Sequence, residues 1–129
     1  MDSFPQELKY TDSHEYVLVE GNIATIGITD YAAEKLGDIV YVELPRVGDV
    51  FIAGQSFGVI ESVKSVSDLY APIGGKVIAV NDSLSDHPEL ITEDSYERGW
   101  ILKIEMEDAI EAEGLMNSDT YASHVTTES

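Results

Sequence analysis

Short β-rich segments separated by glycine and other turn residues recur along most of the chain. This pattern limits the available folds more than any other feature, because many short strands at close spacing form antiparallel sheets that pack as sandwiches or barrels. We expect strands at residues 16–20, 23–28, 39–44, 56–63, 66–70, 76–80 and 100–106. The sequence therefore predicts a mainly β fold, an antiparallel β-sandwich or flattened barrel, with a few short helices.

Two of the expected strands have distinctive patterns. Residues 39–44 are apolar at nearly every position, which predicts a strand buried on both faces and ended by Pro45. Residues 100–106 instead alternate, which predicts a half-buried strand with Trp100 in the core.

Helices are expected at two places. Thr29 is suited to cap a short helix that continues to Leu36 and ends at Gly37. After residue 106 the hydrophobic period changes, and Ser118 is suited to cap a helical segment that continues to Val125.

The chain shows no internal repeat and no Pro/Ser-rich linker, and residues 81–99 have the composition of a polar, irregular loop. Its 129 residues suffice for one core. We therefore expect a single domain over residues 1–129, with a core at about 8–106 and a helical tail at about 107–126.

The chain is strongly acidic, with 25 Asp and Glu against 7 Lys and Arg, a formal net charge of −18. The excess is larger in residues 77–129 (2 − 13 = −11) than in residues 1–76 (5 − 12 = −7). Because such a surface repels phosphate groups and anionic lipids, we expect neither nucleic-acid nor membrane partners. The charge would favour partners with basic docking faces, and improved solubility is the simpler interpretation.

No run approaches the roughly 20 apolar residues of a membrane helix. The first seven residues, Met-Asp-Ser-Phe-Pro-Gln-Glu, lack the basic and apolar regions of a targeting segment. We therefore expect a cytoplasmic protein, and a trimmed organelle protein would have the same sequence features.

No catalytic motif is present. The chain has no Cys, so thiol nucleophiles, Cys-based metal sites and disulfides are all excluded. His14, His87 and His124 lie far apart in the sequence, so each is more simply interpreted as a surface or hydrogen-bonded side chain than as a metal ligand. We expect a non-catalytic protein without a metal site.

The most informative segment is residues 58–68, where Lys64 stands between two expected strands and is flanked by Val63 and Val66. Hairpin turns normally contain Asn-Gly or Asp-Gly, because the favoured turns need positive φ, and this one has no glycine. A lysine at such a position is most often simply solvated. It is also the group that a ligase needs to form an amide with a carboxylate cofactor, with loss of the lysine charge.

Short sequence blocks along nearly the whole chain match one known family in order and spacing. They read Ser13-His14-Glu15, Gly27-Ile28-Thr29-Asp30-Tyr31-Ala32, Leu36-Gly37-Asp38-Ile39-Val40, Val42-Glu43-Leu44-Pro45, Glu61-Ser62-Val63-Lys64, Ser67-Asp68, Ala71-Pro72-Ile73, Pro88-Glu89-Leu90-Ile91 and Gly99-Trp100. With these blocks the chain resembles the H protein of the glycine cleavage system. The resemblance implies a lipoyl-domain-like barrel-sandwich hybrid fold and lipoic acid bound as an amide to Lys64.

The resemblance also implies partners. A pyridoxal-phosphate glycine decarboxylase would pass the aminomethyl group of glycine to the carrier, and a tetrahydrofolate-dependent aminomethyltransferase would take the carbon and release ammonia. An FAD-dependent dihydrolipoyl dehydrogenase would then reoxidise the dithiol. A lipoate ligase or lipoyltransferase would attach the cofactor, and we expect the carrier to be a monomer.

In the family, the Ser-His-Glu block and the acid after the lysine turn line a cleft for the arm. The matching positions are Ser13, Glu15 and Asp68. A carboxylate there would pair with the ammonium carried by the arm, while the cleft excludes water. Simple solvation is the alternative interpretation of the two acids. The sequence departs from the family pattern at Tyr16, Ser65 and Lys76, and none of these changes removes a functional group.

Two other carrier functions remain open. An H-like protein that donates lipoyl groups to other enzymes would use the same lysine. A lipoyl or biotinyl domain of another multienzyme complex also presents a lysine on a hairpin, but its turn typically reads Asp-Lys-Ala or Met-Lys-Met beside a Pro/Ala-rich linker. The Val63-Lys64-Ser65 turn and the missing linker argue against that class.

Overall fold

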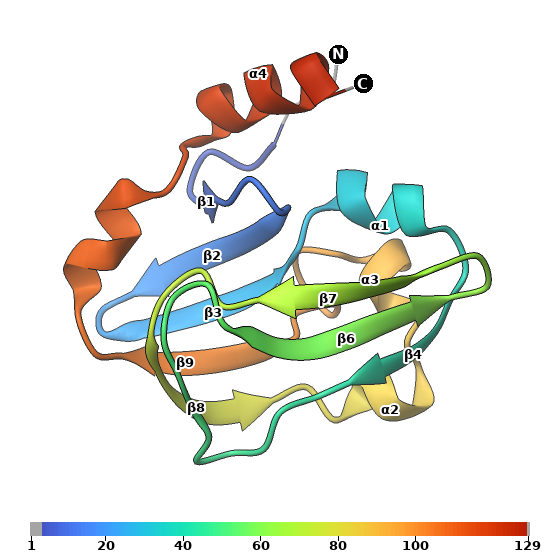
Figure 1. Ribbon diagram of the computed structural model, residues 1–129, viewed down its shortest axis with the longest axis horizontal. Coiled ribbons are helices and arrows are strands. Elements are labelled where there is room, and N and C mark those ends of the chain that lie inside the picture. Colours follow the sequence, from blue (N-terminus) through green and yellow to red (C-terminus); the bar gives the residue numbers. More distant parts are fainter. Residues whose placement is uncertain (1–3, 129) are drawn as a thin grey trace.

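Two antiparallel sheets form a sandwich in the computed structural model, which describes residues 4–128 (Figure 1). Residues 1–3, part of the amino-terminal stretch expected to lack a targeting pattern, and Ser129 lie outside the described residues. The six-stranded sheet has the order β1 (Lys9–Tyr10), β2 (Glu15–Glu20), β3 (Ile23–Ile28), β9 (Leu102–Met106), β8 (Gly75–Val80) and β5 (Val50–Phe51). The three-stranded sheet has the order β4 (Ile39–Glu43), β6 (Ser56–Ser62) and β7 (Val66–Tyr70). The predicted mainly β sandwich is confirmed.

The main core lies between the two sheets. It combines buried side chains of the large sheet, such as Ile26 and Ile104, with side chains of the small sheet, such as Ile60 and Leu69. Burial of this apolar surface is the main favourable contribution to folding.

The strand at residues 39–43 differs from its prediction. Ile39 and Val42 are buried, but Val40 and Tyr41 are 57% and 49% exposed, so the expectation of burial on both faces is wrong. The physical reason is the position of β4 at the edge of the small sheet, where the pairing with β6 also shifts register between Ile39 and Tyr41. The expected core position of Trp100 is also wrong, because this half-buried ring precedes β9 and lies beneath the Lys103 ammonium, 5.5 Å from the ring centroid.

Helix α1 (Asp30–Leu36) forms as predicted. The Thr29 hydroxyl accepts a hydrogen bond from the Ala32 amide, and this cap satisfies a donor of the first helical turn. The helix ends at Gly37, whose φ of 79° favours glycine.

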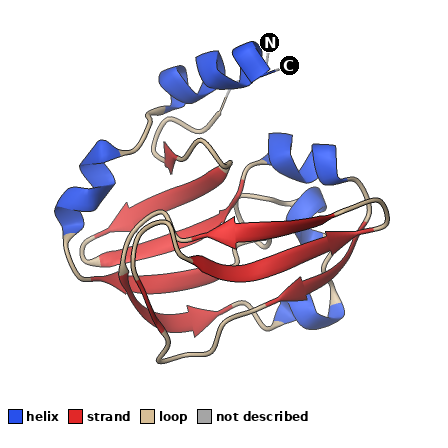
Figure 2. Cartoon of the chain, viewed as in Figure 1, coloured by secondary structure: helices blue, strands red, loops and turns tan. Residues whose placement is uncertain are grey.

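The segment predicted as a loop contains two short helices, α2 (Ser83–Asp86) and α3 (Leu90–Glu93), each with one buried apolar side chain. The predicted helical tail comprises a 3₁₀ helix, η1 (Ala109–Gly114), and helix α4 (Ser118–Glu128) (Figure 2). The cap of α4 is Asn117 rather than Ser118, since the Asn117 side-chain oxygen accepts the Thr120 amide hydrogen. None of the described helices is both long and apolar enough to cross a membrane.

A second, aromatic core joins α4 to the first strands of the large sheet. Its buried members are Phe4, Leu8, Tyr10, Tyr16, Tyr121 and Val125. The rings of Tyr10 and Tyr121 are stacked, with centroids 4.6 Å apart. This cluster fixes α4 above β1 and the turn that follows it, which carries Ser13 and leads into β2 at Glu15.

Tyr16, one of the departures from the family pattern, fits the space available to it. Its ring packs directly over its cross-strand partner Gly27, where a Cβ atom would lie only 2.6 Å from the ring. The hydroxyl donates to the Ser95 carbonyl at 2.7 Å, and burial raises the pKa of this phenol well above its usual value. Gly27 is therefore required for this packing.

Candidate functional site

The turn between β6 and β7 is held by hydrogen bonds on both sides of Lys64. The Ser62 amide donates to the Ser65 carbonyl at 2.8 Å, and the Ser65 amide donates to the Ser62 hydroxyl at 3.1 Å. The Val63 amide also donates to the Asp38 carbonyl at 3.0 Å, which ties the turn to the segment after α1. Lys64 is therefore presented from a fixed backbone without the positive φ that hairpin turns usually need.

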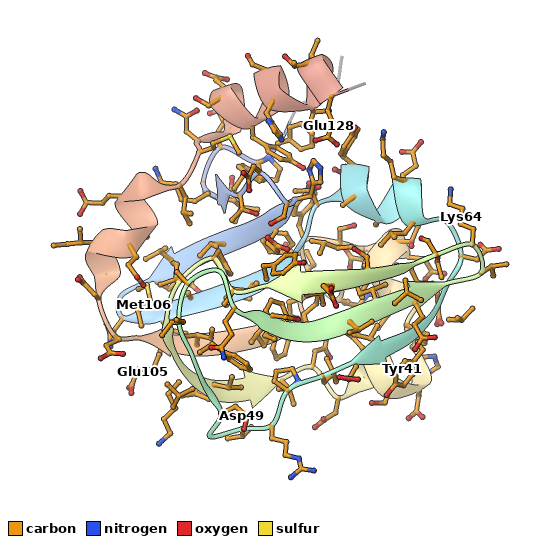
Figure 3. The ribbon with its side chains drawn as sticks, viewed as in Figure 1. Tyr41, Asp49, Lys64, Glu105, Met106 and Glu128 are labelled. Carbon is orange, nitrogen blue, oxygen red and sulfur yellow. The ribbon has the colours of Figure 1, made fainter. Side chains whose placement is uncertain are left out.

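The Lys64 side chain is exposed, and its amine makes no hydrogen bond or ion pair with the described residues. Figure 3 shows it at the outer end of the β6–β7 hairpin. Its Cε lies 3.7 Å from the point that a Cβ atom of Gly37 would occupy, so the stem passes over the end of α1. Val63 and Val66, on either side, are 75% and 68% exposed. The geometry leaves the amine open to an acylating enzyme.

Glu15 is the second notable side chain, because it is a carboxylate with only 1% of its surface exposed. One carboxylate oxygen accepts hydrogen bonds from the hydroxyls of Thr11 and Ser13, each at 2.6 Å. The other accepts the Tyr70 amide hydrogen at 3.2 Å. Burial raises the pKa of Glu15, and these hydrogen bonds only partly oppose that effect.

Two surface pockets meet at Ser13. The larger, which we call the Glu15 pocket, has a volume of about 450 Å³ and is lined by Ser13, Glu15, Tyr70 and Met116 among others. The smaller, which we call the Asp68 pocket, has a volume of about 170 Å³. Its lining includes Ser13, Tyr31, Lys35, Asp68 and Glu128.

The predicted arm residues are thus divided between the two pockets. Ser13 and Glu15 are in hydrogen-bond contact, whereas Asp68 shares the smaller pocket with Ser13. Asp68 lies on β7, two residues before the Tyr70 amide that bonds Glu15. Strand β7 therefore extends from the Lys64 turn past Asp68 to the edge of the Glu15 pocket.

Sequence reasoning missed Thr11 and Tyr70 as partners of Glu15. Thr11 carried a usable signal, because a hydroxyl four residues before Glu15 can bond both the carboxylate and the backbone of a tight turn. It does both here, since its oxygen also accepts the Glu15 amide hydrogen at 3.0 Å. Tyr70 contributes only its backbone amide, which no side-chain pattern can reveal.

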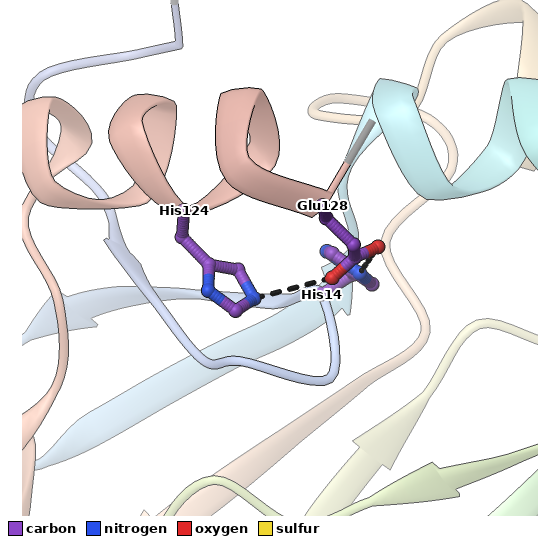
Figure 4. Close-up of side chains that lie close together, drawn as sticks. All are labelled: His14, His124 and Glu128. Atoms are coloured by element: carbon purple, nitrogen blue, oxygen red, sulfur yellow. Dashed lines mark hydrogen bonds and ion pairs between the residues drawn. The ribbon is translucent and has the colours of Figure 1, made fainter.

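Sequence reasoning also missed a cluster of titratable side chains beside the Asp68 pocket. His14 and His124, far apart in the sequence, both contact Glu128 (Figure 4). The spacing of His124 and Glu128, four residues apart, is that of neighbours on one helix face, but no sequence pattern indicated the contact with His14, because the aromatic core brings α4 to the turn that carries His14.

Comparisons with known proteins agree on one family. The family described as "Glycine cleavage H-protein" matches residues 8–128. The chain is 51% identical over 128 residues to the glycine cleavage system H protein of Halalkalibacterium halodurans, covering 99% of this chain and 100% of that one. It is 55% identical over 117 residues to the mitochondrial glycine cleavage system H protein 2 of Arabidopsis thaliana, covering 91% of this chain and 75% of that one.

A solved structure is similar as well. The crystal structure of a glycine cleavage system H protein from Mycobacterium marinum has a TM-score of 0.88 and 36% sequence identity with this chain. The match covers 95% of this chain and 99% of that one.

Proposed function

This chain belongs to the glycine cleavage H-protein family, the non-catalytic lipoyl carriers of glycine cleavage, and we propose that Lys64 is the residue that bears its lipoyl group. The observation that carries the proposal is the state of the Lys64 amine, which is exposed and unpaired among the described residues on a turn held by Ser62 and Ser65. Acylation at this amine breaks no interaction within the described part of the chain.

The residues around Lys64 fit a covalently bound arm. An amide at the amine removes a charge from a group that forms no ion pair in the described chain, so no ion pair is broken when that charge is lost. Exposed Val63 and Val66 supply apolar surface on both sides of the amine, which suits recognition by an attaching enzyme, a lipoate ligase or lipoyltransferase. When bound, the lipoyl ring supplies a disulfide that accepts the aminomethyl group of glycine and returns to the oxidised form by giving up two electrons.

Ser13, Glu15 and Asp68 are proposed to receive the end of the arm. Burial deprives the Glu15 carboxylate of water and raises its pKa. An ammonium that enters the Glu15 pocket would stabilise the ionised carboxylate in place of that water, and so would lower the pKa of Glu15. The Ser13 hydroxyl, already bonded to that carboxylate, keeps it aimed at the pocket. Asp68 flanks the route along β7 between the turn and the pocket.

As a component of the glycine cleavage system, the chain has enzyme partners in that system. We propose that it receives the aminomethyl group from the pyridoxal-phosphate glycine decarboxylase. It would then deliver the carbon to the tetrahydrofolate-dependent aminomethyltransferase and electrons to the FAD-dependent dihydrolipoyl dehydrogenase. The net charge of −18 disfavours association of two copies, which supports a monomeric carrier.

We propose a bacterial cytoplasm as the compartment, because bacterial relatives match over nearly the whole chain. The plant relative is named as mitochondrial, so a mitochondrial location is the alternative.

Intact-mass spectrometry after incubation with lipoate ligase tests the attachment site. The parent chain is expected to gain one lipoyl group, and Lys64→Arg to gain none. Lys35→Arg and Lys76→Arg are matched controls that should be modified like the parent. Modification of the Lys64→Arg chain would contradict the assignment.

Reconstituted glycine cleavage tests the function separately. Turnover should require the lipoylated chain, and Lys64→Arg should not support it. A lipoylated chain that gives no turnover, but transfers lipoyl groups to a second acceptor protein, would instead be a lipoate donor.

A further inference from the structure

Three side chains converge where α4 passes the turn between β1 and β2. His124 and Glu128 are four residues apart on α4 and so lie on one face of the helix, and His14 approaches from the turn (Figure 4). The Glu128 carboxylate lies 2.9 Å from His14 Nε2 and 3.3 Å from His124 Nε2. One ligand atom from each residue lies within 4.8 Å of the others.

We propose that His14, His124 and Glu128 form a binding site for a divalent transition-metal ion of the zinc class. The ligands would be Nε2 of each imidazole and one oxygen of the carboxylate, with water in a fourth position. Zinc binds such atoms at about 2.0–2.2 Å, so the ligands of a tetrahedral site lie about 3.3 Å apart. The observed separations need only small side-chain movements to admit an ion.

The residues behind the cluster support His14 as a ligand. Its other ring nitrogen, Nδ1, lies 2.7 Å from the hydroxyl of Tyr121, which in turn lies 2.8 Å from the Thr29 hydroxyl. Tyr121 is completely buried and stacked on Tyr10, so the position of the imidazole is fixed from behind. A histidine ligand normally donates its second N–H to such a partner.

The same hydroxyls allow His14 to exchange tautomers. Without metal, the Thr29 hydroxyl can donate to Tyr121, Tyr121 to Nδ1, and Nε2–H to the Glu128 carboxylate. With metal, Nδ1–H donates to Tyr121, and Nε2 turns its lone pair toward the ion. Tyr121 therefore remains hydrogen-bonded to His14 in both states.

The surroundings suit a cation with an open coordination position. The Asp68 pocket is lined by both His14 and Glu128, which leaves room for water or another ligand beside the ion. The net charge of −18 attracts cations to the surface. Two features oppose binding: the Lys35 ammonium interacts electrostatically with Glu128, and the Asp12 carbonyl, 3.3 Å from His124 Nε2, competes for that nitrogen.

The chemistry of the ligands selects the ion. Two imidazoles and one carboxylate suit Zn²⁺ and its transition-metal neighbours, whereas Mg²⁺ and Ca²⁺ prefer oxygen ligands alone. A bound ion would link α4 directly to the turn between Ser13 and Glu15. It would therefore stabilise the folded chain, by an amount that rises with the logarithm of the free ion concentration above the dissociation constant. The site does not depend on the lipoyl group.

Isothermal titration of the full chain with ZnCl₂, and separately with MgCl₂, tests the proposal. Both titrations are repeated in a Lys64→Arg background so that no arm sulfur can bind metal. We expect one Zn²⁺ per chain and no comparable Mg²⁺ binding. His124→Ala and Glu128→Gln should each weaken Zn²⁺ affinity at least about tenfold, since even residues behind a ligand alter affinity by that factor.

His87→Ala is the matched control, because His87 also pairs with a glutamate but lies outside the cluster. It should bind Zn²⁺ like the parent. Titration with Co²⁺ should give the intense visible absorption of a tetrahedral site in the parent and lose it in His124→Ala. Circular dichroism checks that each variant is folded. Three outcomes would overturn the proposal: no Zn²⁺ binding by the parent chain, Zn²⁺ binding by folded His124→Ala that is as tight as that of the parent, or a loss of Zn²⁺ affinity in His87→Ala as large as that in His124→Ala.

Discussion

At the scale of single residues, Glu15 has the environment that most needs explanation. A carboxylate with almost no exposed surface is costly unless hydrogen bonds replace its hydration. Thr11, Ser13 and the Tyr70 amide provide three such bonds, yet the pKa of Glu15 is still raised by burial. The folded chain thus holds a group whose charge is incompletely compensated and which faces a pocket. An ammonium bound there would complete the compensation.

The raised pKa of Glu15 makes a pH-dependent contribution to stability. Because it lies above the ordinary value of 4.5, the folded chain retains this proton at pH values where the unfolded chain has lost it. The contribution of Glu15 to stability is therefore greatest below pH 4.5 and falls as the pH rises toward the folded pKa.

Glu15→Gln cannot ionise at this position, so its free energy of unfolding should not include this decrease as the pH rises. We expect the difference in free energy of unfolding between parent and variant to shift in favour of the variant from pH 4 to pH 7, as measured by urea unfolding. Glu20→Gln, on the exposed end of the same strand, is the control for replacing a glutamate with a glutamine outside the Glu15 pocket. A difference that stays constant with pH would show that burial does not perturb the Glu15 pKa.

At the scale of elements, the β6–β7 turn is stiff because serine side chains take the place of the usual glycine. The Ser62 hydroxyl accepts the Ser65 amide hydrogen and also lies 3.2 Å from the Ser65 carbonyl. Ser62 is itself buried, so its hydroxyl has few alternative partners.

Ser62→Ala should destabilise the turn by about 1 kcal/mol, the usual contribution of one hydrogen bond, and should slow lipoylation without abolishing it. The measurement is the initial rate of mass gain with lipoate ligase. Ser56→Ala, at the other end of β6, is the control, because its hydroxyl makes only a 3.4 Å bond to Gly58. Equal rates for Ser62→Ala and the parent would mean that stiffness of the turn does not affect recognition.

The elements that could be predicted from the sequence are those with a clear local pattern. Alternation identified the strand ending at Met106, and the Thr29 and Gly37 pair identified the bounds of α1. Strands β1 and β5 have two residues each, and α2 and α3 have four, so none is long enough to show a period. The exposed face of β4 depends on its edge position, which is a property of the whole sheet.

The same distinction applies to the site. Lys64 could be proposed as the attachment residue because its turn is local and because the family resemblance covers it. Sequence reasoning could not identify the Tyr70 amide as a partner of Glu15 or the contact of His14 with His124, since both depend on packing between segments that are distant in the sequence.

At the scale of the whole molecule, charge is the dominant property. Residues 77–129 carry the larger acidic excess. One of these acids, Glu105, lies on the opposite side of the molecule from Lys64 in the view of Figure 3. An acidic surface accelerates encounters with basic docking faces, and salt screens this attraction over a distance of about 10 Å at 0.1 M.

We expect the kcat/KM of dihydrolipoyl dehydrogenase for the reduced, lipoylated chain to fall several-fold when ionic strength rises from about 0.05 to about 0.5 M. Free dihydrolipoamide, a neutral substrate of the same enzyme, is the control and should show little change. If the carrier and the free substrate respond alike, the acidic surface serves solubility rather than docking.

The aromatic core also determines when the fold can be completed. Phe4 and Tyr10 are synthesised more than a hundred residues before their partner Tyr121. A growing polypeptide therefore holds these rings uncovered until α4 has been synthesised, and until then the turn carrying His14 lacks its support from that helix.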